Sequence, residues 1–375
     1  MRKPKVALVH DYLLQYGGAE KTLEAIAELF PEAPIYTSVY QPKNFSGVLA
    51  DSKKVIVPKG LGSTFRALPI LSKYFTFLNP LVFESFDLGD YDIVISDSSS
   101  YAKGVLTKPD QLHISYIHTP PRFLYGYSVE STKRNAWYYR WVVVFIDHFL
   151  RVWDFNAAQR PNYLVANSKE IQGRIKKFYK RDSTVIYPPV ELASGNQSES
   201  KGDFYLVAGR LVAYKNFDFV IKAFGELPNL RLRVIGTGPE KAKLKKMAGD
   251  NVEFLGRVSD EEKHKLMSEC KGLINSVEDE DFGIVPIEVL SHGNPVLAHK
   301  SAGHLETVID GKTGMYFDEV NVGCLVEKIK EFDDKINAKG YDSNTIREST
   351  KQFSKDNFKQ TFNEYVMGKW QKHIS

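Results

Sequence analysis

Short apolar runs alternate along the chain with segments whose apolar residues recur every three or four positions. The first apolar run, residues 5–10, predicts a buried strand. Leu23, Ile26 and Phe30 follow at helical spacing and predict a helix. Further strands are expected at residues 35–39, 92–96, 113–118, 163–166 and 184–187. Because strands that alternate with helices pair in parallel, the first half of the chain predicts an open α/β sheet.

A polar segment with almost no apolar residue, residues 191–202, is interpreted as an interdomain linker. After it, the second half of the chain repeats the alternation of strand and helix patterns. Strands are expected at residues 204–208, 231–235, 252–255, 272–276 and 295–298, and helices at 217–224, 240–247, 261–270, 286–291 and 304–309. The length of 375 residues suits two α/β domains. We expect Rossmann-like domains over 1–195 and 200–350 that face each other across a cleft, with a helix at 353–372 returning to the first.

Composition narrows the class of protein. The net charge of +4 is too small to favour nucleic-acid binding. Cys270 and Cys324 lie far apart, so neither a disulfide framework nor a metal site is expected, and a reducing cytoplasm fits. The apolar run after the basic N-terminus is too short for a signal peptide, and no run reaches the roughly 18 residues that a membrane span needs.

The most informative segment is SVEDEDFGIVPIEVLSHG, residues 276–293. Glu280 is expected in a loop after a strand and Glu288 in the first turn of the next helix. Gly283 would let the backbone approach a ligand closely. No side chain between Gly283 and Pro286 can cap the helix, so its N–H groups are available for an anion. Carboxylates for sugar hydroxyls and amides for phosphate suit a sugar nucleotide.

Three further loops carry candidate chemistry at the ends of strands. Arg210 and Lys215 follow the first strand of the second domain, where two cations could neutralise a departing diphosphate without a metal. Gly17 and Gly18 precede the first helix and could present amides to phosphate. His118 ends a strand of the first domain. Taken singly, each pattern also has a purely structural explanation. The basic pair could be solvated, the glycines could form a tight turn, and the histidine could be structural.

The order of these motifs resembles the family-four retaining glycosyltransferases of the GT-B fold, whose hallmarks are G-G-x-E, H-x-P, G-R-L-x-x-x-K and E-x-F-G-I-V-x-x-E. The resemblance implies that Glu280 and His118 contact the donor sugar and that Glu288 holds the nucleotide ribose. It implies that Arg210 and Lys215 bind the donor diphosphate. The remaining donor-binding positions that it implies are Gly17, Gly18, Gly209, Arg257, Val258, Asp281, Phe282, Gly283, Ile284 and Val285.

The resemblance also sets expectations about the reaction. H-x-P-x-R at His118 leans toward mannosyltransferases of surface-polysaccharide or lipopolysaccharide synthesis, and so toward GDP-mannose as donor and a saccharide or lipid-linked acceptor. No cofactor is expected besides the donor. D-x-D patterns at 90–92 and 279–281 are interpreted as accidental, so catalysis without a metal is expected. UDP-sugar donors, a nucleotide-sugar epimerase of the same fold and a non-catalytic binding module are the alternatives.

Two aromatic segments, residues 64–86 and 137–154, combine basic residues with many apolar ones. Such segments can lie in a membrane interface, whereas a core helix with an aromatic stripe explains the second equally well. We therefore expect a cytoplasmic protein that could associate with the inner face of the cell membrane, with the first segment helping to receive a lipid-linked acceptor.

Overall fold

The computed structural model describes residues 3–58, 76–128, 140–193 and 202–375. The chain divides into two compact units, each described here by itself. Unit 1 comprises Met1–Pro189 together with Lys355–Ser375, and unit 2 comprises Val190–Ser354. Of the predicted linker, residues 194–201 lie outside the described part of the chain.

Unit 1 is built on a parallel seven-stranded sheet with the order β3-β2-β1-β4-β5-β6-β7. Its strands are β1 (Val6–His10), β2 (Ile35–Thr37), β3 (Val55–Ile56), β4 (Ile93–Ser98), β5 (Leu112–Ile117), β6 (Tyr163–Ala166) and β7 (Thr184–Val185). Its helices are α1 (Gly18–Leu29), α4 (Asn79–Glu84), α5 (Arg140–Ala157), α6 (Lys169–Tyr179) and α14 (Lys355–Ile374). Short 3₁₀ helices include η3 (Thr76–Leu78) and η4 (Ala102–Gly104).

The sheet of unit 1 is buried on both faces, as its continuous apolar strands require. Side chains alternate along β1, so Val6 and Leu8 enter one apolar cluster while Ala7 and Val9 enter another. The first cluster includes residues of α1 and α14, and the second includes residues of α4 and α5. The order of the strands reverses direction between β1 and β4, which places a topological switch point at the ends of these two strands.

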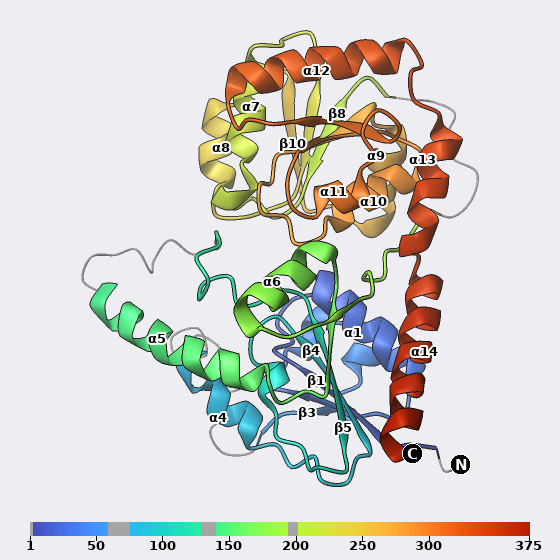
Figure 1. Ribbon diagram of the computed structural model, residues 1–375. Coiled ribbons are helices and arrows are strands. Elements are labelled where there is room, and N and C mark those ends of the chain that lie inside the picture. Colours follow the sequence, from blue (N-terminus) through green and yellow to red (C-terminus); the bar gives the residue numbers. More distant parts are fainter. Residues whose placement is uncertain (1–2, 59–75, 129–139, 194–201) are drawn as a thin grey trace. The chain divides into compact units, whose positions relative to one another are not determined.

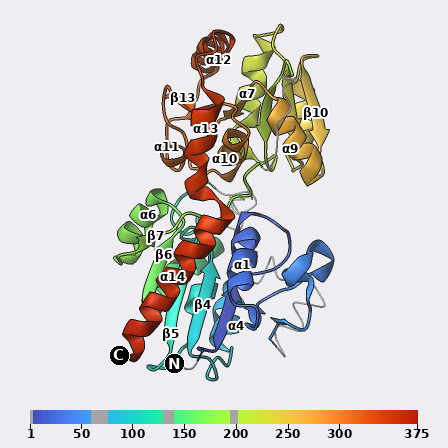
Figure 2. The ribbon, with the colours of Figure 1, turned by 90° about the vertical axis from the view of Figure 1, so that its right-hand side faces the viewer.

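Helix α14 comes from the end of the chain and packs beside α1 (Figure 2). Phe358, Phe362 and Val366 recur every four residues, and all three are buried. The rings of Phe358 and Phe362 each lie 6.0 Å from the ring of Tyr116 on β5. The last helix of the chain therefore completes the core of unit 1.

Unit 2 holds a parallel six-stranded sheet with the order β10-β9-β8-β11-β12-β13. Its strands are β8 (Tyr205–Ala208), β9 (Leu232–Ile235), β10 (Val252–Gly256), β11 (Gly272–Asn275), β12 (Val296–His299) and β13 (Gly314–Phe317). Its helices are α7 (Phe217–Gly225), α8 (Lys241–Met247), α9 (Asp260–Glu269), α10 (Ile284–Ser291), α11 (His304–Thr307), α12 (Val322–Asn337) and α13 (Ser343–Thr350). This order is that of a doubly wound sheet, with its switch point between β8 and β11.

Both units confirm the predicted α/β class and the parallel pairing of strands (Figure 1). Within the described residues, no helix is both long enough and apolar enough to cross a membrane.

Candidate functional site

The switch point of unit 2 brings two loops of the sequence together. Strands β8 and β11 pair in parallel, so the loops that follow them leave the same edge of the sheet. The first loop carries Arg210 and Lys215, and the second carries Glu280. Open α/β sheets bind ligands at this position because the chain turns away in opposite directions on either side of it.

An ion pair joins these two loops. Lys215 Nζ lies 3.2 Å from Glu280 Oε2, and both side chains are about four-fifths buried. Burial disfavours the charge of Lys215, but the neighbouring carboxylate of Glu280 more than offsets this, so the pKa of Lys215 lies above its usual value. Lys215 is therefore a fixed cation at the end of the sheet.

The residues beside this pair fix its geometry. Asn216 has a left-handed conformation with φ of 54°, and its Nδ2 donates to Ser276 O and to Glu278 Oε2, both at 3.2 Å. The hydroxyl of Ser276 donates to the carbonyl of Lys215 at 2.9 Å. These bonds hold the two loops together, so the positions of Lys215 and Glu280 do not depend on their ion pair alone.

Glycines allow a third loop to support the first. A Cβ on Gly236 would lie 1.8 Å from the carbonyl oxygen of Gly209, and one on Gly238 would lie 2.2 Å from that of Leu211. Leu211 N also donates to Thr237 O at 2.9 Å. The turn after β9 thus packs directly on the backbone around Gly209. Arg210 itself is exposed.

Helix α10 begins two residues earlier than predicted, which corrects the expected place of Glu288. Gly283 precedes the helix with φ of 95°, a conformation that favours glycine, and no side chain caps the helix. Because α10 starts at Ile284, Glu288 lies in the second turn rather than the first. It is 3% exposed, and its Oε1 lies 3.0 Å from Nζ of Lys263 on α9. The sequence interpretation did not include Lys263.

The loop between β11 and α10 rests on the start of α11. Gly303 N donates to Glu280 O at 2.9 Å, and a Cβ on Gly303 would lie 2.6 Å from the Cα of Phe282. His304 is fully buried with Nδ1 2.9 Å from His299 O, and burial lowers its pKa to about 4. Burial thus keeps the imidazole of His304 neutral, although the nearby carboxylate of Glu280 favours the charged form. Sequence motifs did not suggest this relationship.

The other predicted positions of unit 2 are spread along the same edge. Phe282 is buried against the ring of Phe353 at 5.5 Å. Arg257 is exposed and Val258 half-buried, after the edge strand β10. Of the remaining predicted positions, Gly283 is buried, whereas Gly209, Asp281, Ile284 and Val285 are half-buried. Lys215 pairs with Glu280, and Glu288 pairs with Lys263.

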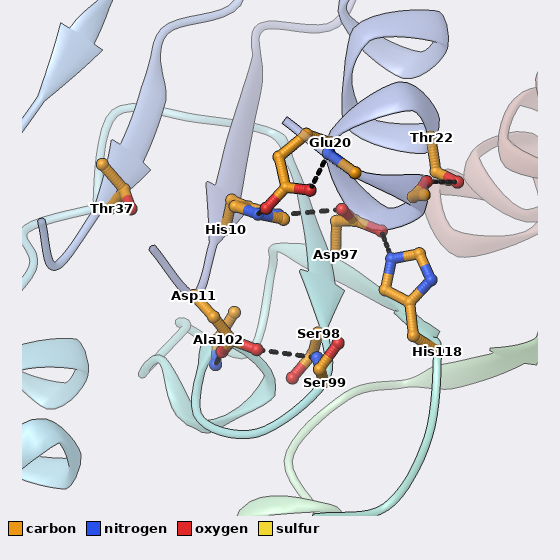
Figure 3. Close-up of polar contacts among 12 residues, drawn as sticks. His10, Asp11, Glu20, Thr22, Thr37, Asp97, Ser98, Ser99, Ala102 and His118 are labelled. Carbon is orange, nitrogen blue, oxygen red and sulfur yellow. Dashed lines mark hydrogen bonds and ion pairs between the residues drawn. The ribbon is translucent and has the colours of Figure 1, made fainter. Parts of the chain in front are cut away.

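The switch point of unit 1 holds a largely buried chain of ionisable side chains (Figure 3). Asp97 Oδ1 lies 2.6 Å from His118 Nε2, and Asp97 Oδ2 lies 2.9 Å from His10 Nδ1. His10 Nε2 lies 3.7 Å from Glu20 Oε1. Despite burial, the hydrogen bonds to Asp97 and Glu20 raise the pKa of His10 to about 10. Of these residues the sequence gave a role only to His118, although Glu20 is the last residue of the G-G-x-E loop.

The glycine loop is attached to the same chain. Gly17 is the N-cap residue of α1, and its N–H donates to Glu20 Oε2 at 2.9 Å. Gly18 is the first residue of the helix. The amide of Gly17 is therefore already engaged by a side chain of its own helix.

Asp11, next to this loop, has a structural partner for each carboxylate oxygen. Oδ2 accepts the N–H groups of Ser99 and Ser100, both at 2.7 Å. Oδ1 accepts those of Tyr101 and Ala102 at 2.7 and 2.6 Å. A carboxylate that accepts four amides is a poor nucleophile, because its charge is already stabilised.

Comparison with known proteins places this architecture. Residues 191–345 match the family described as "Glycosyl transferases group 1". The matched segment is less than half of the chain. The match confirms the resemblance to the family-four enzymes that the motifs indicated.

Further glycosyltransferases are related to this chain in sequence. An uncharacterised glycosyltransferase of Methanocaldococcus jannaschii is 29% identical over 216 residues, 56% of this chain and 59% of that protein. The GDP-mannose-dependent alpha-(1-6)-phosphatidylinositol monomannoside mannosyltransferase of Mycolicibacterium smegmatis is 34% identical, covering 32% of this chain and 36% of its own. Human alpha-1,3/1,6-mannosyltransferase ALG2 is 26% identical over 87% of each chain. The chain thus spans less than two thirds of the length of the first two relatives.

Solved structures show the same fold at low identity. The lipopolysaccharide outer core galactosyltransferase WaaB matches with a TM-score of 0.66 and 16% identity over 97% of this chain and 99% of its own. The sucrose-phosphate synthase of Thermosynechococcus elongatus matches with a TM-score of 0.70 and 14% identity, covering 99% and 100% of the two chains. The chain therefore has the two-domain GT-B fold.

Proposed function

We propose that the protein is a retaining hexosyltransferase that moves mannose from GDP-mannose to a saccharide or lipid-linked acceptor. The observation that carries the proposal is the Lys215–Glu280 pair at the switch point of unit 2, beside a helix start that no side chain caps. Mannosyltransferases among the relatives favour the sugar and the donor.

The geometry supports a division of labour at the reacting centre. Glu280 accepts hydrogen bonds from hydroxyls of the donor sugar, while Lys215 and Arg210 stabilise the departing diphosphate. Because Lys215 is held as a cation, it supplies positive charge to the leaving group with no change in protonation. In a front-face displacement, the departing phosphate oxygen takes the proton of the acceptor hydroxyl, and the new glycosidic bond keeps the anomeric configuration of the donor.

A donor and product test decides between this proposal and its alternatives. Purified protein is offered GDP-mannose, UDP-glucose and UDP-GlcNAc with a set of saccharide and polyprenyl-linked acceptors. We expect mannose transfer from GDP-mannose, an α-linked product by NMR and full activity in EDTA. A β-linked product would refute retention, and loss of activity in EDTA restored by a divalent ion would refute metal independence. A UDP-sugar as the better donor would change the donor assignment. Release of an epimerised sugar without acceptor would indicate the epimerase.

The exposed side chains of helix α5 support a lipid bilayer as the surface on which the protein meets its acceptor. Leu150 and Asp154 face inward, where Asp154 pairs with the buried Lys103 at 2.5 Å. The opposite face carries large apolar side chains that are 39–67% exposed, namely Val144, Phe145, Phe149, Val152 and Phe155. Helix α5 is thus a core helix on one face, as one interpretation of segment 137–154 expected, and it carries an exposed apolar stripe on the other.

We propose that this stripe lies in the interface of the membrane that carries the acceptor. Nearby, Phe77 of η3 and Leu81 of α4 are 40% and 57% exposed, and α4 packs into the same apolar cluster as α5. A mannosyltransferase relative is named for a phosphatidylinositol-linked acceptor, which fits a lipid surface. Residues 64–75 of the other aromatic segment and residues 137–139 lie outside the described part of the chain.

A further inference from the structure

The buried carboxylate of Asp97 holds two histidines at once (Figure 3). It projects from β4 directly opposite His10 on the paired strand β1, in register. His118 follows the last residue of β5, the strand on the other side of β4. Asp97 is 1% exposed, so the carboxylate that joins the two histidines is shielded from solvent.

The contact continues from His10 to the glycine loop. His10 Nε2 faces Glu20 Oε1 at 3.7 Å, and Glu20 Oε2 accepts the Gly17 N–H at 2.9 Å. The links from Asp97 to the two histidines join elements that lie far apart in the sequence. Together they form a relay, His118–Asp97–His10–Glu20–Gly17, that connects the two segments of unit 1 singled out by the motifs.

The charges in the relay determine where its protons reside. His10 lies between two carboxylates, which keep it protonated, so its Nδ1–H donates to Asp97. Burial opposes ionisation of Asp97, but the two histidines more than offset this and lower its pKa. An ionised carboxylate has only acceptors. The Nε2 of His118 must therefore carry a hydrogen and donate it to Asp97.

This arrangement leaves one ring nitrogen of His118 for a ligand. Within the described residues, Nδ1 of His118 has no hydrogen-bond partner, and the side chain is 12% exposed. A neutral imidazole with hydrogen on Nε2 has a lone pair on Nδ1, so that atom accepts a hydrogen bond.

We propose that Asp97 and His10 are positioning residues that hold His118 as its Nε2–H tautomer, so that Nδ1 accepts a hydrogen bond from a hydroxyl of the sugar substrate. This inference rests on the proposed function for the identity of the ligand, but the tautomer itself is a property of the free protein. The same relay fixes the start of α1 through Glu20 and Gly17.

The test reads the tautomer directly. In protein labelled with ¹⁵N-histidine, long-range ¹H–¹⁵N correlation spectra distinguish a protonated from an unprotonated ring nitrogen. For His118 we expect hydrogen on Nε2 and none on Nδ1 near pH 7.5 without ligand, with the resonance assigned by its loss in His118→Gln. Asp97→Asn should shift the ring away from this state. A ring with hydrogen on Nδ1, or one that Asp97→Asn leaves unchanged, would overturn the inference.

Kinetics and a matched control separate positioning from general stability. His10→Asn is expected to lower kcat/KM about 10–100-fold, as loss of a charged hydrogen bond would. The control is His113→Asn, because His113 is also a fully buried histidine of this sheet but bonds Ser96 instead of Asp97. We expect it to lower stability while leaving the His118 tautomer and kcat/KM unchanged. Equal losses of kcat/KM in both variants would overturn the positioning role.

Ligand binding distinguishes this inference from the proposed function. GDP-mannose should perturb the Nδ1 resonance of His118. Binding and turnover of GDP-mannose without that perturbation would overturn the hydroxyl contact and leave the proposed function standing. If no sugar nucleotide binds, the proposed function and its ligand fail together, whereas the tautomer result still decides whether the relay positions His118.

Discussion

The ammonium of Lys215 lies 3.2 Å from the carboxylate of Glu280, although 65 residues separate them in the sequence. Adjacent parallel strands β8 and β11 create this proximity, because each residue belongs to the loop that follows one of them. A cation and a hydrogen-bond acceptor are thereby presented together where a doubly wound sheet binds its ligands.

Replacing this cation should affect turnover more than folding. Lys215→Gln removes positive charge from the leaving group, and we expect kcat to fall about 10²–10³-fold. The matched control is Lys222→Gln, because Lys222 is a half-exposed lysine that pairs with Asp218 on the surface of α7. Steady-state kinetics of both variants with GDP-mannose provide the measurement. Near-normal kcat in Lys215→Gln would contradict the assigned role.

Removing the carboxylate of Asp11 should destabilise unit 1. Asp11→Ala leaves the N–H groups of residues 99–102 without their acceptor, and each hydrogen bond to a charged group contributes about 1.5–3 kcal/mol. We expect a loss of about 3–5 kcal/mol in the free energy of unfolding, measured in urea. This is less than the sum of four such bonds, because water can reach the part-buried amides of Ser99 and Ser100. A variant of unchanged stability that no longer turns over would point instead to a chemical role for Asp11.

Stability should pass through a maximum near pH 6.5. The pKa of His10 is raised to about 10, so its contribution is complete below the unfolded value near 6.5 and is lost as the pH rises toward 10. Burial lowers the pKa of His113 to about 3 and that of His304 to about 4. Their contributions are complete above 6.5 and are lost as the pH falls toward those values.

Thermal denaturation between pH 5 and 9 tests this prediction. We expect the melting temperature to fall on both sides of the maximum, and His10→Gln to flatten the alkaline side while lowering stability at neutral pH. If the melting temperature falls equally on the alkaline side in the wild type and in His10→Gln, then His10 does not cause the loss of stability at high pH.

The apolar stripe of α5 predicts binding to lipid. Phe145 and Phe149 are 67% and 57% exposed. Replacing both with Ser should abolish sedimentation with vesicles of phosphatidylcholine and phosphatidylglycerol while leaving transfer to a soluble acceptor unchanged. A control with Leu305→Ser alters an exposed apolar residue of unit 2 that is 55% exposed. Unchanged vesicle binding in the double variant, or a dimer in solution that it dissociates, would reject the membrane assignment.

Sequence pattern predicted every strand of the two sheets except β3 and β13. Strand β6 has the predicted bounds, 163–166, and β4 runs two residues beyond its predicted end. Strand β3 was not predicted, because it has only two residues and is defined by its pairing with β2. The predicted strand at 35–39 ends at Thr37, since Ser38 turns away to bond the carbonyl of Asp11.

The site was predictable only where loops carry a recognisable spacing. Motifs identified Lys215, Glu280 and His118, but they gave no sign of Lys263, whose partner Glu288 depends on how α9 packs against α10. The relay was missed because Asp97 lies within an apolar strand, and its partners are 87 and 21 residues away. A buried aspartate in register with a histidine is a tertiary relationship that only the pairing of β1 with β4 discloses.

The place of α14 also bears on how the protein is made. Phe358 and Phe362 fill the interior beside Tyr116, yet they are translated after the whole of unit 2. During synthesis on the ribosome, unit 2 can acquire its native structure first, while the amino-terminal sheet waits for the final twenty or so residues to emerge. Expression of residues 1–189 alone should accordingly yield an aggregation-prone fragment, which a peptide spanning 355–375 supplied in trans would rescue.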